Sequence, residues 1–303
     1  MPNKKSPSKT SAITKEVETN QGNLVKTENQ SPNYANILEW LMNFLLYEVP
    51  PGPKIIPVNI IINLQKCGIS VWTIFLMFYF NNFSTAMWFY LLLHGSYGAF
   101  WVLKDVIFPD PNFQKKATVM SGGLVIWLTV LGHYMVPVYQ LASRNANNDI
   151  SIERMWVCTL IYIVGLVLML LSDSQKFYTL KYKKGLISDG MFKYTRNPNY
   201  LGEIMIYGAF ILLVNDTLAY ICVIQVWVIV FSIRMYIKEV SLRKKEGWQE
   251  YSARSWVLIP KINGRTVDSL IFYGAFAYLT YSIYLNGGLT ETAQLVQNKI
   301  KAK

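Results

Sequence analysis

The apolar residues of this chain form runs of roughly twenty positions, about the length that crosses the hydrocarbon core of a membrane as a helix. Leu160–Leu171 contains no charged residue, whereas Lys66 places a charge inside the first run. The pattern predicts an all-α fold, a polytopic membrane helix bundle of about seven transmembrane helices with a pocket at its cytosolic face. The expected spans are residues 55–80, 86–103, 118–139, 155–172, 200–214, 218–236 and 268–285.

The remaining polar segments suggest four regions. Residues 1–33 have few large apolar side chains and are expected to form a disordered cytosolic tail. Residues 34–171 form an N-terminal transmembrane scaffold, in which Ile37–Tyr47 is too short to span and is expected to be an interfacial helix. Residues 172–262 form a C-terminal membrane domain that holds the polar motifs described below, and 263–303 add one more helix and a tail.

The net charge of +11 would suggest nucleic-acid binding in a soluble protein. However, 22 of the 29 Lys and Arg residues fall in segments on one side of the membrane, if the N-terminus is cytosolic. The positive-inside rule describes this asymmetry, so we expect a lipid bilayer and no nucleic acid as partner. The three cysteines and two histidines form no spaced motif, and we expect no metal site.

The most distinctive polar stretch is GMFKYTRNPNYLGE, from Gly190 to Glu203. Asn197 is a favourable N-cap and Pro198 a favourable first helical residue. The free N–H groups of such a helix start attract anions, and Arg196 adds a fixed positive charge. The stretch therefore suggests an anionic ligand at the membrane surface, although a helix cap with positive-inside charges would explain it equally well.

A second basic segment follows the expected hairpin of residues 200–236 and is rich in Arg, Tyr and Trp. These side chains suit a planar, charged ligand, through cation–π contacts and forked hydrogen bonds. A solvated loop with interfacial aromatic residues is the alternative. Because a hairpin of two spans returns to the same face, we expect the two basic segments to meet in one pocket.

His94 and Tyr97 lie three residues apart in the second expected span, hence on one helix face. Polar groups at this depth are unusual in membrane helices. They either satisfy one another between helices or supply a proton donor that faces a lipid substrate.

These motifs resemble a known superfamily. The likeness is to a C-terminal membrane domain shared by steroid 5-alpha-reductases, sterol reductases, isoprenylcysteine methyltransferases and phospholipid methyltransferases. It rests on RNPNYLGE at 196–203, the hairpin that follows, GWQEY at 247–251 and LIP at 258–260. The likeness covers about residues 172–262. It implies a soluble cofactor bound from the cytosolic side and a lipid-like substrate that enters laterally among the helices.

Three further motifs resemble the uncharacterised DUF1295 branch of this superfamily. They are HGSYG at 94–98, KD at 104–105 and FPD at 108–110. They extend the resemblance over most of the chain.

The resemblance allows two cofactors, NADPH and S-adenosylmethionine. The methyltransferases usually have Arg-His-Pro, whereas this chain has Asn197 in place of the histidine, and they carry a Glu-Glu pair where Val240 follows Glu239. The many Arg and Lys residues also suit a pyrophosphate and a 2′-phosphate. We therefore expect an integral membrane oxidoreductase, similar to steroid 5-alpha-reductases, that reduces a C=C bond of a sterol-like or isoprenoid lipid with NADPH.

In this interpretation Tyr97 or His94 is the catalytic proton donor. The residues expected to bind the cofactor are Arg196, Asn199, Tyr200, Glu203, Glu239, Tyr251 and Arg254. The first alternative is an S-adenosylmethionine-dependent lipid or isoprenylcysteine methyltransferase, with the same pocket. The second is a non-catalytic structural subunit of a membrane complex.

The C-terminal Lys299, Lys301 and Lys303 fit a dilysine retrieval signal and favour the endoplasmic reticulum, while a mitochondrial inner membrane would also agree with the pattern. Dilysine signals must face the cytosol, but seven spans from a cytosolic start place this tail on the opposite side. The charge asymmetry rests on more residues, so we give it more weight.

Overall fold

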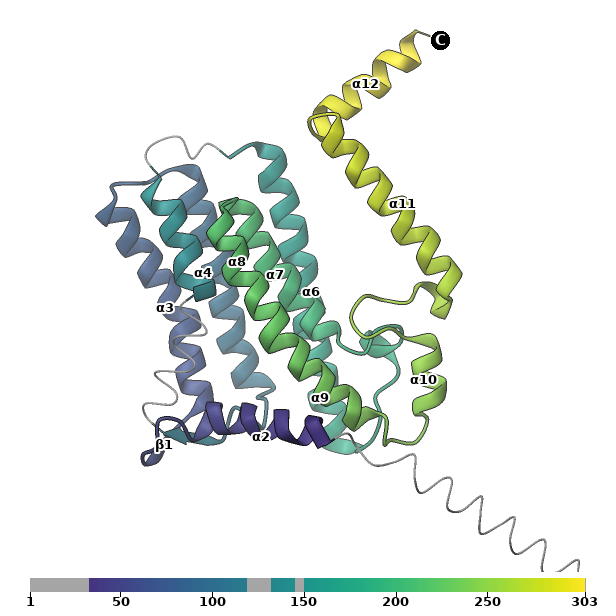
Figure 1. Cartoon of the computed structure of the whole chain (residues 1–303). Helices are drawn as coiled ribbons and strands as arrows, with labels where there is room; N and C mark the ends of the chain where they lie inside the picture. Colours follow the sequence, from purple (N-terminus) through teal and green to yellow (C-terminus); the bar gives the residue numbers. More distant parts are fainter. Residues whose placement is uncertain (1–32, 119–131, 145–149, 303) are drawn as a thin grey trace, which may run out of the picture.

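The computed structural model describes residues 33–118, 132–144 and 150–302, and this part of the chain is mostly helical, as expected (Figure 1). The predicted tail lies outside the described residues except for Asn33, the first residue of helix α2.

The N-terminal elements include two helices of the bundle, α3 (Val58–Tyr79) and α4 (Thr85–Ile107), and three shorter elements at one end of it (Figure 1). The shorter elements are α2 (Asn33–Tyr47), β1 (Lys54–Pro57) and β2 (Lys116–Thr118). The two short strands pair antiparallel, with Pro57 opposite Lys116. Helix α2 lies across the bundle end rather than along it, and it packs against β2 and α9 (Figure 1).

Helices α6 (Ile152–Tyr182) and α7 (Pro198–Val214) form the most closely packed pair. Two glycines allow this close approach. A Cβ on Gly165 would lie 2.7 Å from the Gly202 carbonyl oxygen, and a Cβ on Gly202 would lie 2.5 Å from the Gly165 carbonyl oxygen. Gly98 plays the same part between α4 and α3, where a Cβ would lie 2.2 Å from the Lys66 carbonyl oxygen.

The expected hairpin through Asn215 and Asp216 is present. Asn215 ends α7 in the left-handed conformation, at φ 49°. The Asp216 carboxylate then caps α8 (Thr217–Val226), accepting from the backbone N–H groups of Leu218 and Ala219. The helix continues through the π-helical turn η2 (Trp227–Phe231) into α9 (Ser232–Leu242), so that one helical stretch returns to the end at which α7 begins.

Shorter elements complete the pocket end of the molecule. They are η1 (Gly190–Phe192), α10 (Trp248–Arg254) and η3 (Ile262–Gly264). Helix α11 (Thr266–Leu285) then runs toward the opposite end and leads into α12 (Leu289–Lys301) (Figure 1). There the Thr290 N–H donates to the Glu153 carboxylate at 3.1 Å, which ties the start of α12 to the start of α6.

Within the described residues, three helical stretches are long and apolar enough to cross a membrane: Val58–Tyr79, Ile152–Tyr182 and Thr217–Leu242. Helix α7 is a shorter apolar helix. Helices α4 and α11 occupy two further expected spans, but polar side chains make them less apolar, and most of the span expected at 118–139 lies outside the described residues. The count of seven spans stays a prediction.

Candidate functional site

The two basic segments are joined by backbone hydrogen bonds at one end of the bundle. The Arg196 N–H donates to the Trp256 carbonyl at 2.9 Å, and the Lys261 N–H donates to the Tyr194 carbonyl at 2.8 Å. The Tyr251 hydroxyl donates to the Phe192 carbonyl at 2.8 Å. Burial raises the pKa of the Tyr251 phenol well above its usual range, so this hydroxyl remains a donor. The expectation that these segments meet is therefore confirmed.

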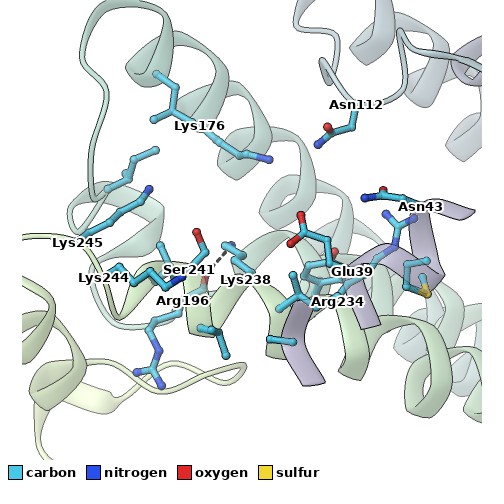
Figure 2. A pocket seen from close by; sticks show the side chains of 18 of the residues that line it. Glu39, Asn43, Asn112, Lys176, Arg196, Arg234, Lys238, Ser241, Lys244 and Lys245 are labelled. Atoms are coloured by element: carbon cyan, nitrogen blue, oxygen red, sulfur yellow. Dashed lines mark hydrogen bonds between the residues drawn. The ribbon is translucent and has the colours of Figure 1, made fainter. Parts of the chain in front are cut away.

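Beside this junction lies a cavity of about 530 Å³, which we call the basic cavity. Figure 2 shows Lys176, Lys244 and Lys245 on one side, with Glu39 and Asn43 of α2 across from them. Among the described residues that line it, Glu39 has the single carboxylate. The cationic lining residues are Lys115, Lys176, Arg196, Arg234, Lys238, Lys244 and Lys245. This excess of positive charge favours a ligand with several negative charges.

Arg196 lines the basic cavity, but its guanidinium is bound within the protein. Its Nε and Nη2 atoms each donate to a carboxylate oxygen of Glu239 at 2.9 Å, and Nη1 donates to Ser255. Both side chains of the pair are about nine-tenths buried. The guanidinium also lies over the Trp248 ring, at 5.2 Å from its centroid. Arg196 therefore fixes α9 and the 255–261 loop around the cavity, and its charge is compensated by Glu239.

A second cavity of about 380 Å³, which we call the apolar cavity, extends from this region into the bundle. The residues that line both cavities are Met42, Leu46, Phe113, Lys176, Tyr200, Arg234 and Lys238. Its outer part holds the ion pair of Lys104 with Asp173 and a longer contact of 3.6 Å between Lys176 and Asp110. A ligand in the basic cavity can therefore lie next to a second ligand in the apolar cavity.

The inner end of the apolar cavity contains a buried ammonium among tyrosine hydroxyls. Lys66 donates to Tyr97 Oη at 2.6 Å and to Tyr134 Oη at 2.7 Å, with Tyr207 Oη at 3.4 Å. The Tyr207 hydroxyl in turn donates to Glu203 at 3.0 Å. The Lys66 ammonium also lies 3.8 Å from the centroid of the Trp101 ring. These contacts connect a cation to a carboxylate through hydrogen-bonded hydroxyls, an arrangement through which a proton can move.

Three buried polar atoms that belong to lining residues have no hydrogen-bond partner within the described residues. They are Gln65 Nε2, Asn199 Oδ1 and Arg234 Nε. Buried polar atoms are nearly always paired, so these atoms are available to a bound polar group. The three atoms offer two donors and one acceptor to a polar ligand group.

The residues expected to bind the cofactor divide into three groups. Arg196, Tyr200 and Tyr251 line the basic cavity, while Asn199, Tyr200 and Glu203 line the apolar cavity. Glu239 and Arg254 line neither. Glu239 holds Arg196, and Arg254 donates to the Glu250 carboxylate and the Ser188 carbonyl.

The two expected proton donors are buried behind the apolar cavity. Tyr97 does not line it and reaches it through Lys66. His94 Nδ1 lies 2.9 Å from Tyr90 Oη, its ring stacks on Phe210, and its Nε2 has no partner among the described residues. The His94 ring also contacts the Tyr134 ring, with centroids 4.9 Å apart, so His94 is separated from the cavity by Tyr134 as Tyr97 is by Lys66.

Asn197 occupies the predicted N-cap position of α7, but its side chain does not cap the helix. The carboxamide instead donates to the Val257 carbonyl at 2.8 Å. The sequence could not show this, because the acceptor lies sixty residues further along the chain.

Sequence reasoning missed four site residues, Lys66, Tyr134, Lys176 and Tyr207, and it included Arg234 and Lys238 in the second basic segment without naming them as cofactor ligands. A signal existed for Lys66, since an ionisable residue inside an apolar span is a functional candidate by default. Tyr207 follows Glu203 by four residues on one helix, a spacing that allows side-chain contact. The three remaining cations lie on α6 and α9, and their convergence depends on how these helices pack.

Among the described residues, no cluster of His, Cys, Asp and Glu could hold a metal ion. The described cysteines Cys67, Cys158 and Cys222 are all free.

Comparison with protein families gives one match, to the family described as "Protein of unknown function (DUF1295)", over residues 113–255. No curated protein matches the chain. The motifs between 94 and 110 that suggested the same family lie outside the matched range. The match includes α6, α7, α9 and most of the lining of the basic cavity, so this part of the chain is similar to the DUF1295 family.

Proposed function

We propose that this protein is an integral membrane oxidoreductase that reduces a C=C bond of a sterol-like or isoprenoid lipid with NADPH. The observation that supports the proposal most strongly is the basic cavity, whose lining has a single carboxylate and six lysine and arginine side chains in addition to Arg196, which is paired with Glu239. NADPH carries a pyrophosphate and a 2′-phosphate, and such groups are recognised by lysine and arginine.

The residues present fit this cofactor. Lys176, Lys244 and Lys245 would lie around its phosphates in the basic cavity. Asn199 and Gln65, each with an unpartnered amide atom, would hold polar groups where the apolar cavity begins. When bound, NADPH supplies a hydride.

The chain's own residues would supply the proton. Lys66 lines the apolar cavity and is held by Tyr97 and Tyr134, so that a proton lost at the cavity can be replaced along the hydroxyl chain. Lys66 would then be the donor that reaches the lipid, and Tyr97 would act through it. The apolar part of the cavity would bind the lipid and exclude water from the reacting carbons.

S-adenosylmethionine is the alternative cofactor. It carries a sulfonium cation and a zwitterionic amino acid, and the six lining Lys and Arg residues other than Arg196, which Glu239 already neutralises, oppose binding of a further positive charge. The charge of the cavity thus favours NADPH over S-adenosylmethionine. A lipid methyltransferase and a non-catalytic subunit that binds neither cofactor are the two competing outcomes of the experiment below.

The decisive experiment is thermal unfolding of the detergent-purified protein with NADPH, NADH, S-adenosylmethionine and S-adenosylhomocysteine in turn. A ligand that binds only the folded state adds about 2.7 kcal/mol of stability at a hundred times its dissociation constant. We expect a rise in melting temperature with NADPH that exceeds the rise with NADH. A shift with only the sulfonium compound and its product would support a methyltransferase, and no shift in folded protein would support a structural subunit.

For location we propose an integral membrane protein whose basic cavity faces the cytosol. Lys299 and Lys301 lie on α12, at the end of the molecule opposite this cavity (Figure 1). Because a dilysine signal must face the cytosol, a cytosolic cavity and a retrieval signal at this tail exclude each other. No feature of the described structure therefore supports the assignment of this protein to the endoplasmic reticulum.

A further inference from the structure

Helix α2 exposes an unusually apolar side. Tyr34, Ile37 and Trp40 are about three-fifths exposed, and Leu41 and Phe44 are also exposed. These positions recur at three- and four-residue intervals, so they share one helix face. The Trp40 and Phe44 rings stack with their centroids 5.1 Å apart. The result is a continuous apolar and aromatic stripe, and on a water-soluble protein such a face would be turned inward.

The polar side of α2 faces the open basic cavity, and its side chains are exposed rather than buried. Asn36, Glu39 and Asn43 line the basic cavity, and Glu39 and Asn43 are drawn at its edge in Figure 2. Between the two sides, Met42 and Leu46 line both cavities. Helix α2 is therefore a wall with a polar inner surface toward a charged cavity and an apolar outer surface away from the protein.

The depth of α2 follows from what it packs against. Its last residue, Tyr47, forms a small core with Val58 and Ile61 of α3. Val58 is the first residue of a helix that is long and apolar enough to cross a membrane. Helix α2 thus lies level with the first turn of a candidate span, where hydrocarbon meets lipid head groups. Aromatic residues such as Tyr34 and Trp40 are enriched at this depth.

We infer that the outer face of α2 binds the lipid bilayer and that α2 lies in the membrane interface as the wall between lipid and the basic cavity. The partner is the head-group and upper acyl region of the leaflet at the cavity end. An interfacial helix of this kind buries its apolar face about 5–10 Å into that region. The inference depends on the orientation of α2 and not on which cofactor the basic cavity binds.

Electron paramagnetic resonance of nitroxide-labelled protein in liposomes tests this orientation. Cys67, Cys158 and Cys222 are first replaced by alanine. Single cysteines are then introduced as Ile37→Cys and Phe44→Cys on the outer face and as Glu39→Cys and Asn43→Cys on the inner face. We expect the outer labels to collide more with oxygen, which concentrates in lipid, and the inner labels to collide more with a water-soluble nickel complex.

Two results would overturn the inference. Nickel accessibility at Ile37→Cys and Phe44→Cys equal to that at Glu39→Cys would show that the outer face meets water. Low accessibility to both reagents at the outer positions would show that a protein, either a second copy or another subunit, covers the stripe. Each labelled protein must keep the melting transition of the cysteine-free parent. If an outer variant does not keep this melting transition, Leu41→Cys, which is also on the exposed face, is used in its place.

Discussion

The buried pair of Arg196 and Glu239 connects three segments around the basic cavity. Removing only Arg196 leaves the Glu239 carboxylate buried without its counter-charge, which typically costs about 3–5 kcal/mol. We predict that Arg196→Ala lowers the free energy of unfolding by about this amount, and that Arg196→Ala/Glu239→Ala loses less than Arg196→Ala alone. Chemical unfolding of the purified single and double variants measures both quantities, and losses that simply add would contradict the pairing.

The structural role of Arg196 also affects how cofactor binding should be tested. Because Arg196→Ala weakens the cavity wall itself, loss of NADPH binding in that variant would not separate a ligand contact from a structural one. Lys176 is a better probe, since its side chain is 40% exposed and its ion-pair contact with Asp110 is long, at 3.6 Å. Exposed pairs of this kind contribute little to stability.

The hydroxyl of Tyr97 holds Lys66 and lies outside both cavities. We predict that Tyr97→Phe reduces NADPH-dependent reduction of a sterol with a C=C bond by about a hundredfold, the lower range for loss of a proton-transfer group. The dissociation constant of NADPH should stay unchanged. Turnover in proteoliposomes and NADPH titration measure the two effects.

Tyr90→Phe is the matched control, because Tyr90 is a buried tyrosine of the same helix that contacts His94 instead of Lys66. An equal loss of turnover and NADPH affinity in Tyr97→Phe, or an equal loss of turnover in the control, would contradict the proposed role.

At the level of elements, the interface of α6 and α7 positions the residues of both cavities. We predict that Gly202→Ala destabilises the protein, because the new methyl carbon would lie 2.5 Å from the Gly165 carbonyl oxygen and 2.6 Å from the Met169 nitrogen. Overpacking typically costs about 1–3 kcal/mol.

Gly274→Ala is the control for this prediction, since a Cβ at that position meets nothing within 4 Å. Thermal unfolding should show a lowered melting temperature for Gly202→Ala and little change for Gly274→Ala. Equal melting temperatures would show that the helices are not in close contact at this point.

Apolar run length predicted the helices well, because membrane-length apolar runs have few other folded states. The expected span at 200–214 corresponds to α7, and turn residues Asn215 and Asp216 were identified correctly. The antiparallel pairing of β1 with β2 was not predicted. Each strand is very short, and strand pairing depends on segments that the sequence separates by about sixty residues.

At the level of the whole molecule, the basic cavity gathers residues from α2, the 110–115 loop, α6, α7 and α9. The sequence identified the α7 and α9 contributions because their basic motifs are local and because a hairpin returns both to one face. It could not identify Glu39 or Lys176, which converge only through the crossing of α2 over the bundle end (Figure 1). Local motifs thus gave the position of the site, and long-range packing determined most of its lining.

The central claim is that the basic cavity binds the phosphates of NADPH. It is tested most directly by the NADPH dissociation constant, measured by quenching of tryptophan fluorescence, for the wild type, Lys176→Gln and Lys181→Gln. Lys181 is exposed in the last turn of the same helix and lines neither cavity. We predict that Lys176→Gln weakens binding about fivefold, equivalent to loss of a hydrogen bond worth ~1 kcal/mol. Lys181→Gln should match the wild type. Equal affinities of all three proteins, or no NADPH binding by the folded wild type, would contradict the claim.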